Sequence, residues 1–249
     1  MIGVVIVAIA AGLVIGLGSG SVGVKLEQME GLEDEETQER AEYERDVAAA
    51  IDRARESGEA SPSAEPWVSE RYGWTWLELV LSPLLMAGGF AAFVLHGPVD
   101  PSLLVHLLWA AVFVHVLVFD LKHRLILNKI TYPAIVAAIG LAPISPGLTI
   151  GRALIGCAGV ALFFFVLNVI SRGSIGLGDA KLGALVGAVT GAGGDPAHLG
   201  AVYATIYAIL LGGGVAMLLL ITRLRRLKDP IPYGPFLCAG AAIILYQGP

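Results

Sequence analysis

Two aspartate residues, Asp120 and Asp179, each lie at the end of a long apolar run. A carboxylate close to membrane hydrocarbon costs roughly 2.5–3.5 kcal/mol on insertion scales, so such residues are rare and usually functional. Two carboxyl groups brought together can share one proton and activate a water molecule, which is the chemistry of aspartic proteases. That chemistry requires elements that hold both side chains at one place.

The composition indicates a membrane protein. The 249 residues are 56% hydrophobic, with a mean hydropathy of +0.75, whereas soluble domains are about 45–50% apolar. Continuous apolar runs recur after residue 72, which favours an all-α polytopic fold over a β-barrel, whose strands alternate. We predict about eight transmembrane helices, over residues 2–24, 76–96, 102–120, 129–144, 150–171, 180–194, 199–222 and 232–247.

The charges divide the chain into three parts. Residues 25–72 contain 15 acidic and 6 basic residues, a net charge of −9, and the remainder has a net charge of +4. We predict a first transmembrane helix (1–24), an acidic cytoplasmic segment (25–75) and a membrane-embedded core (76–249). Within the acidic segment, Glu27–Glu56 is typical of a solvated helix, followed by a linker over Ser57–Pro66.

The basic residues predict the orientation. With eight spans, 15 of the 16 Lys and Arg residues fall on one side, and only Arg152 lies near the other. The positive-inside rule makes the first side cytoplasmic. Asp120 and Asp179 both lie at the cytoplasmic ends of their helices, so a shared site at the cytoplasmic face of the cell membrane is expected.

Glycine residues recur at every fourth position in two of the predicted helices. They are Gly12, Gly16 and Gly20 in the first helix, and Gly183, Gly187 and Gly191 after Asp179. A face of small residues lets a neighbouring helix approach to backbone contact. Close approach to the second of these faces is one way to bring Asp120 beside Asp179.

Three segments together resemble a known family. They are residues 120–128 (DLKHRLILN), residues 176–182 (GLGDAKL) and residues 231–237 (IPYGPFL). In their order and in their spacing among helices they are similar to the type IV prepilin peptidases, a group of Gly-x-Gly-Asp intramembrane aspartic proteases. The resemblance covers roughly residues 76–247.

The resemblance implies an endopeptidase that removes short basic leader peptides from prepilins or pseudopilins, with Asp120 and Asp179 as the catalytic pair. The supporting motif residues are Gly176, Gly178, Lys122, Asn128, Lys181, Pro232, Gly234 and Pro235. Lys122, Arg124 and Lys181 lie close to the pair in sequence, and they either stabilise its charged form or are ordinary basic residues of the cytoplasmic side. Asn128 either contacts Asp120 or caps the fourth helix, and Pro232 and Pro235 form either a helix entry or a turn that lines the site.

The cysteine residues and the segment after the first helix bear on the expected cofactors and on a second activity. The family's loop often carries two zinc-binding C-x-x-C pairs, but residues 25–75 contain no cysteine, so we predict no metal and no cofactor. Cys157 and Cys238 both lie in apolar runs and are expected to be buried helix residues. The loop and first helix look remodelled, which makes N-methylation of the product doubtful. The expected partners are the prepilin substrate and the lipid bilayer, without nucleic acid, and the oligomeric state stays open.

Two alternatives to the protease are considered. Intramembrane carboxylates also serve proton-coupled transporters, whose sites lie near the bilayer midplane. A non-catalytic assembly factor would keep the fold and lose the pair of aspartates. The depth of the two carboxylates separates the protease from the transporter.

Overall fold

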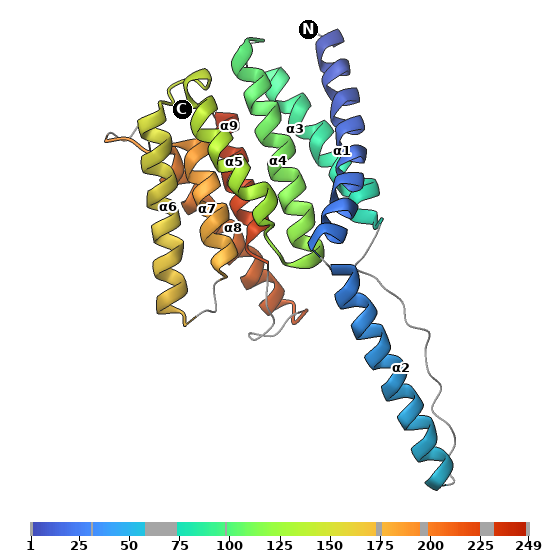
Figure 1. Cartoon of the computed structure of the whole chain (residues 1–249). Helices are drawn as coiled ribbons and strands as arrows, with labels where there is room; N and C mark the ends of the chain where they lie inside the picture. Colours follow the sequence, from blue (N-terminus) through green and yellow to red (C-terminus); the bar gives the residue numbers. More distant parts are fainter. Residues whose placement is uncertain are drawn as a thin grey trace.

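The computed structural model of the chain describes residues 2–30, 32–57, 74–97, 99–172, 176–194, 199–224 and 232–247, and every regular element among them is a helix. The elements are α1 (Ile2–Glu30), α2 (Leu32–Ser57), the π-helix η1 (Leu77–Leu81), α3 (Ser82–His96), α4 (Pro101–His123), α5 (Asn128–Leu141), the 3-10 helix η2 (Ala142–Ile144), α6 (Ile150–Ile170), α7 (Leu177–Thr190), α8 (Gly200–Ile221) and α9 (Gly234–Gln247). They form a bundle from which α2 projects at one end (Figure 1).

Five helical segments of the described chain are long and apolar enough to cross a membrane: Ile2–Met29, Leu77–His96, Pro101–His123, Ile150–Ile170 and Gly200–Ile221. The helices α5, α7 and α9 have 14 residues each, which gives a length of about 21 Å against a hydrocarbon thickness of about 30 Å. The prediction of an all-α polytopic membrane fold is confirmed. The number of complete crossings stays a prediction.

The N-terminal helix runs past its predicted end at residue 24. It continues to Glu30, and the acidic segment forms the separate helix α2. The prediction of a solvated helix over Glu27–Glu56 is wrong for Glu27, whose side chain is buried at 1% exposure. Except for Ser57, the predicted linker Ser57–Pro66 lies outside the described residues, and the three-part division of the chain stays a prediction.

The short helix α7 lies at the centre of the bundle. It packs against α5, α6, α8 and α9, and its residues 180 and 182–189 are all buried. A short helix of this kind is compatible with a membrane because the surrounding protein, rather than lipid, covers most of its surface. The helix that carries Asp179 is therefore held by four neighbouring helices.

The glycine row of α7 makes its close contact with α6. A Cβ atom on Gly187 would clash with the backbone carbonyl of Gly156, and a Cβ on Gly156 would clash with that of Gly187. Gly183 lies against the side chains of Val160 and Phe164, also in α6. The row therefore does permit backbone contact, but its partner is α6, and the expectation that it brings Asp120 to Asp179 is wrong. The row packs against α6 because α6 has a glycine of its own, Gly156, where the two helices cross.

We predict that Gly187→Ala destabilises the α6–α7 pair. The added methyl group must push two backbones apart, which costs about 1–3 kcal/mol in a close-packed core. Thermal unfolding of the detergent-solubilised protein measures the loss. Gly159→Ala in α6 is the matched control, because a Cβ there meets no other atom within 4 Å. Equal unfolding temperatures for the two variants would contradict the prediction.

The first glycine row packs as predicted. A Cβ on Gly12 would lie 2.6 Å from the Cα of Ala87, Gly16 lies against the backbone of Pro83, and Gly20 lies against the ring of Trp74. In addition, the hydroxyl groups of Ser19 and Ser82 lie 2.7 Å apart. The small residues of α1 thus let it pack closely against α3.

Candidate active site

The end of α4 places Asp120. The helix stops because Arg124 adopts a left-handed conformation (φ 54°), and its N–H donates to the carbonyl oxygen of Asp120 at 2.8 Å. The Asp120 side chain points into the bundle and is 4% exposed. One of its carboxylate oxygens, Oδ2, is buried and makes no hydrogen bond with any described residue. The carboxylate is therefore a buried acceptor at the end of α4.

The start of α7 places Asp179. Gly176 precedes the helix in an extended conformation, and the N–H of Asp179 donates to its carbonyl oxygen at 3.1 Å. The Asp179 carboxylate in turn lies back against the backbone of Gly176, as an acidic residue does in a capping box. Gly178 packs against the side chain of Ile126, in the connection between α4 and α5. The two glycines of the motif therefore fix the carboxylate and the helix entry.

The two aspartates share one region at the ends of their helices. They are close enough for the charge of Asp179 to act on the Asp120 carboxyl group. Gly234, the first residue of α9, completes the region: its backbone faces the Asp120 carboxylate, and a Cβ built there would lie 2.5 Å from Oδ2. Only glycine lets α9 begin this close to the carboxylate. The three sequence segments that suggested a family thus meet at one place.

The helix that lies beside both α4 and α7 is α9. Pro232 and Pro235 flank its first turn and are half-buried. Pro235 lies in the first turn of α9, where a backbone N–H has no partner within the helix, so proline is tolerated there. Tyr233 lies between the two prolines, and its backbone carbonyl oxygen accepts hydrogen bonds from the N–H groups of Phe236 and Leu237 at 3.1 and 3.3 Å. The start of α9 is therefore both a helix entry and a wall of the site.

Two further residues border the aspartates and were not predicted as part of the site. The charge of Asp179 acts on Tyr233, and the charge of Asp120 acts on Cys238. Tyr233 lies within the third segment, so its neighbours in the sequence could have identified it. Cys238 carried no such signal, and it is buried as expected for an apolar helix residue.

Lys181 and Asn128 contact each other. The Lys181 ammonium donates to Asn128 Oδ1 at 2.8 Å and lies 5.7 Å from the centre of the Tyr132 ring. The side chain of Asn128 therefore joins α5 to α7. Of Lys122, Arg124 and Lys181, it is Arg124 whose charge acts on the Asp120 carboxyl group.

Lys122 belongs to a separate buried cluster, which we call the ion cluster: Glu27, Glu78, Lys122 and His123. The Lys122 ammonium lies 2.5 Å from Glu27 Oε1 and 2.8 Å from Glu78 Oε1, and His123 Nε2 lies 2.8 Å from the same Glu27 oxygen. Glu78 also accepts the backbone N–H of Thr75 at 2.9 Å. The cluster joins α1, η1 and α4. Lys122 therefore holds the helix of Asp120 in place through its ion pairs with Glu27 and Glu78.

Metal ligands do not gather in the part of the chain that the structure describes. No group of three or more His, Cys, Asp or Glu side chains there is arranged to hold an ion. The aspartates themselves can act as acid and base, and this is the chemistry that their arrangement offers.

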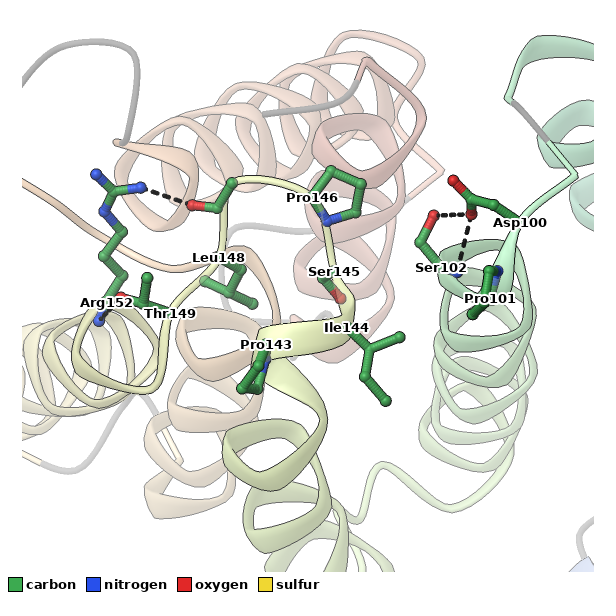
Figure 2. A pocket seen from close by; sticks show the side chains of 11 residues that line it. Asp100, Pro101, Ser102, Pro143, Ile144, Ser145, Pro146, Leu148, Thr149 and Arg152 are labelled. Carbon is green, nitrogen blue, oxygen red and sulfur yellow. Dashed lines mark hydrogen bonds between the residues drawn. The ribbon is translucent and has the colours of Figure 1, made fainter.

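A cavity of about 470 Å³ lies at the opposite end of α4, between its N-terminus and the connection from η2 to α6 (Figure 2). Asp100 caps α4 there, and the hydroxyl of Ser102, with the backbone, holds the pKa of its carboxyl below the usual value. Arg152 donates to the carbonyl of Gly147 at 2.7 Å. Asp100 therefore completes a helix end, Arg152 bonds a carbonyl of the connection before α6, and the length of α4 separates Asp100 from Asp120 by about 30 Å.

Comparison with known proteins gives a consistent picture. Residues 103–219 match the model of the type IV leader peptidase family. This range contains both aspartates and ends before Gly234. Curated relatives carry the name prepilin leader peptidase/N-methyltransferase. The one from Bacillus subtilis (strain 168) is 27% identical over 168 residues, 66% of this chain and 64% of the relative.

The relative from Burkholderia pseudomallei (strain 1026b) is 29% identical over 172 residues, 67% of this chain and 52% of the relative. The chain thus spans less than two thirds of the length of either protein. No solved structure matches the chain.

Proposed function

We propose that this chain, which belongs to the type IV leader peptidase family through its residues 103–219, is a membrane aspartic endopeptidase that cleaves leader peptides from type IV prepilins or pseudopilins. The observation that carries the proposal is the meeting of three distant segments at one point. The buried Asp120 carboxylate lies against Gly234, and the charge of Asp179 acts on it.

The proposed reaction uses the two carboxyl groups in complementary protonation states. Carboxyl groups that share a site do not both ionise readily, so one keeps its proton. The ionised group removes a proton from water, which attacks the scissile carbonyl carbon. The protonated group donates a hydrogen bond to the carbonyl oxygen, and a proton passes to the leaving amine as the C–N bond breaks. The pair titrates as a unit, so neither aspartate is assigned the proton.

The proposed site faces the cytoplasm at the edge of the membrane. Asp120 lies in the last turn of α4, one turn before Arg124, and the basic residues of the chain gather on that side. A carrier site would be expected near the bilayer midplane. The terminal position therefore favours the protease over the proton-coupled transporter.

The proposal does not extend to methyl transfer. The names of the relatives include that second activity, but the alignments leave 36% and 48% of those proteins uncovered. The two proposed catalytic aspartates, by contrast, both lie inside the range that matches the family.

The test is cleavage of a panel of type IV prepilins and pseudopilins by the purified chain in lipid. Loss of the leader is followed by gel shift, and the mass of the new N-terminus locates the cut and reveals any added methyl group. We expect one cut after the basic leader, at the same rate in buffer with and without EDTA, because the carboxyl groups supply both the acid and the base. Intact substrates throughout the panel, or cleavage abolished by EDTA, would refute the proposed chemistry.

A further inference from the structure

An apolar groove runs along the outside of the bundle between α5, α6 and α7. Its volume is about 420 Å³, and its walls include Tyr132, Ile135, Ala161, Phe165, Leu177 and Lys181. Tyr132, Phe165 and Leu177 are each about half exposed. Apolar side chains of this size at the surface of a membrane helix face acyl chains, and the groove gives such a chain a concave wall.

Lys181 is the one charged residue among those that line this groove. The Lys181 ammonium is held by Asn128 Oδ1 at 2.8 Å and lies 5.7 Å from the centre of the Tyr132 ring. Both partners are neutral. Lys181 makes no ion pair with any residue that the structure describes. An ammonium has three N–H donors, and only one of those of Lys181 is used by Asn128, so a positive charge with further donors lines the apolar groove.

We propose that this groove binds an anionic phospholipid, with the phosphate on Lys181 and an acyl chain against the wall formed by Ala161 and Phe165. The combination of one oriented cation and an adjoining apolar trough matches an amphiphile with a negative head. A basic leader peptide is a poor fit, because Lys181 would repel it. The groove shares α7 with Asp179.

The ion cluster provides a useful contrast. There Lys122 is surrounded by two carboxylates and is 2% exposed, so its charge is compensated inside the protein. Lys181 is partly exposed and opens onto the groove. Of these two lysines, it is Lys181 that can attract an anion from the membrane surface.

The experiment is native mass spectrometry of the full chain, titrated with phosphatidylglycerol or with phosphatidylcholine of the same acyl chains. We expect the wild type to bind phosphatidylglycerol more tightly than phosphatidylcholine. A juxtamembrane basic residue contributes enough to change affinity roughly fivefold. Lys181→Gln should therefore weaken phosphatidylglycerol binding by about that factor and leave phosphatidylcholine binding unchanged. Ala161→Trp should fill the groove and weaken binding of both lipids.

Two variants serve as matched controls. Arg223→Gln removes an exposed charge at the end of α8, and Ala158→Trp adds the same bulk to an exposed position of α6 outside the groove. Neither should change lipid binding. Equal phosphatidylglycerol affinity in wild type and Lys181→Gln would overturn the proposal even if Ala161→Trp does not fold. Reduced substrate cleavage by Ala161→Trp with unchanged lipid binding would also overturn it, and would assign the groove to a protein segment.

Discussion

Replacing Asp120 with Asn is expected to lower the rate of leader cleavage by a factor on the order of 10⁴, the upper range for loss of general acid–base catalysis. The amide is close to the carboxyl group in size, so the contact with Gly234 and the packing of α4 should be retained. It can neither take a proton from water nor carry the negative charge. The rate of product formation, measured with saturating prepilin, reports this loss.

The same result is expected for Asp179→Asn, and the double variant should be no worse than either single one, because groups that act as a unit are not additive. Asp100→Asn is the control on the same helix. Its carboxylate caps the opposite end of α4, and Asn is an equally good cap, so cleavage should be unaffected. Activity within a few-fold of wild type in Asp120→Asn or Asp179→Asn would remove that residue from the chemistry.

Lys122→Met is expected to cause the largest loss of stability. The change leaves Glu27 and Glu78 buried at 1% and 5% exposure without the ammonium between them. Removing one partner of a buried ion pair costs about 3–5 kcal/mol, because the remaining charge is left uncompensated. Chemical denaturation in mixed micelles, followed by helical circular dichroism, measures the free energy of unfolding.

Arg40→Met is the control for that measurement. Arg40 pairs with Glu44 at 2.9 Å, but both side chains are about 60% exposed, and exposed pairs contribute only about 0.3–0.5 kcal/mol. Adding Glu27→Gln and Glu78→Gln to Lys122→Met should recover part of the loss, because it removes the stranded charges. Equal stability of the Lys122→Met and Arg40→Met variants would show that the ion cluster is not a stabilising contact.

The sequence was sufficient to predict the helices and the approximate place of each aspartate. Continuous apolar runs fix helices, and the asymmetry of the basic residues puts both aspartates at the same end. The role of Lys122 was harder to predict, although helix geometry contained a warning. Residues two apart on a helix are separated by about 200°, so Lys122 faces away from Asp120. Arg124, four residues on, lies on the same side, and its charge does reach Asp120.

Partners that are distant in the chain could not be predicted in this way. The acidic composition of the segment after residue 24 suggested a solvated helix for Glu27, because sequence pattern says nothing about a buried lysine elsewhere. Similarly, the glycine row of α7 predicts backbone contact but does not identify the neighbour. That choice depends on which helix offers a complementary glycine, and Gly156 in α6 does so.

The position of α9 has a consequence for how the two carboxyl groups are aligned. Asp120 belongs to a helix fastened to α1 and η1 by the ion cluster, and Asp179 belongs to a helix fastened to α6 by touching backbones. These are two separately braced halves, and α9 packs against a helix of each. The distance between the carboxyl groups therefore depends on how closely α4 and α7 each pack against α9. In the proposed mechanism, the geometry of the reaction therefore depends on a helix that contributes neither aspartate.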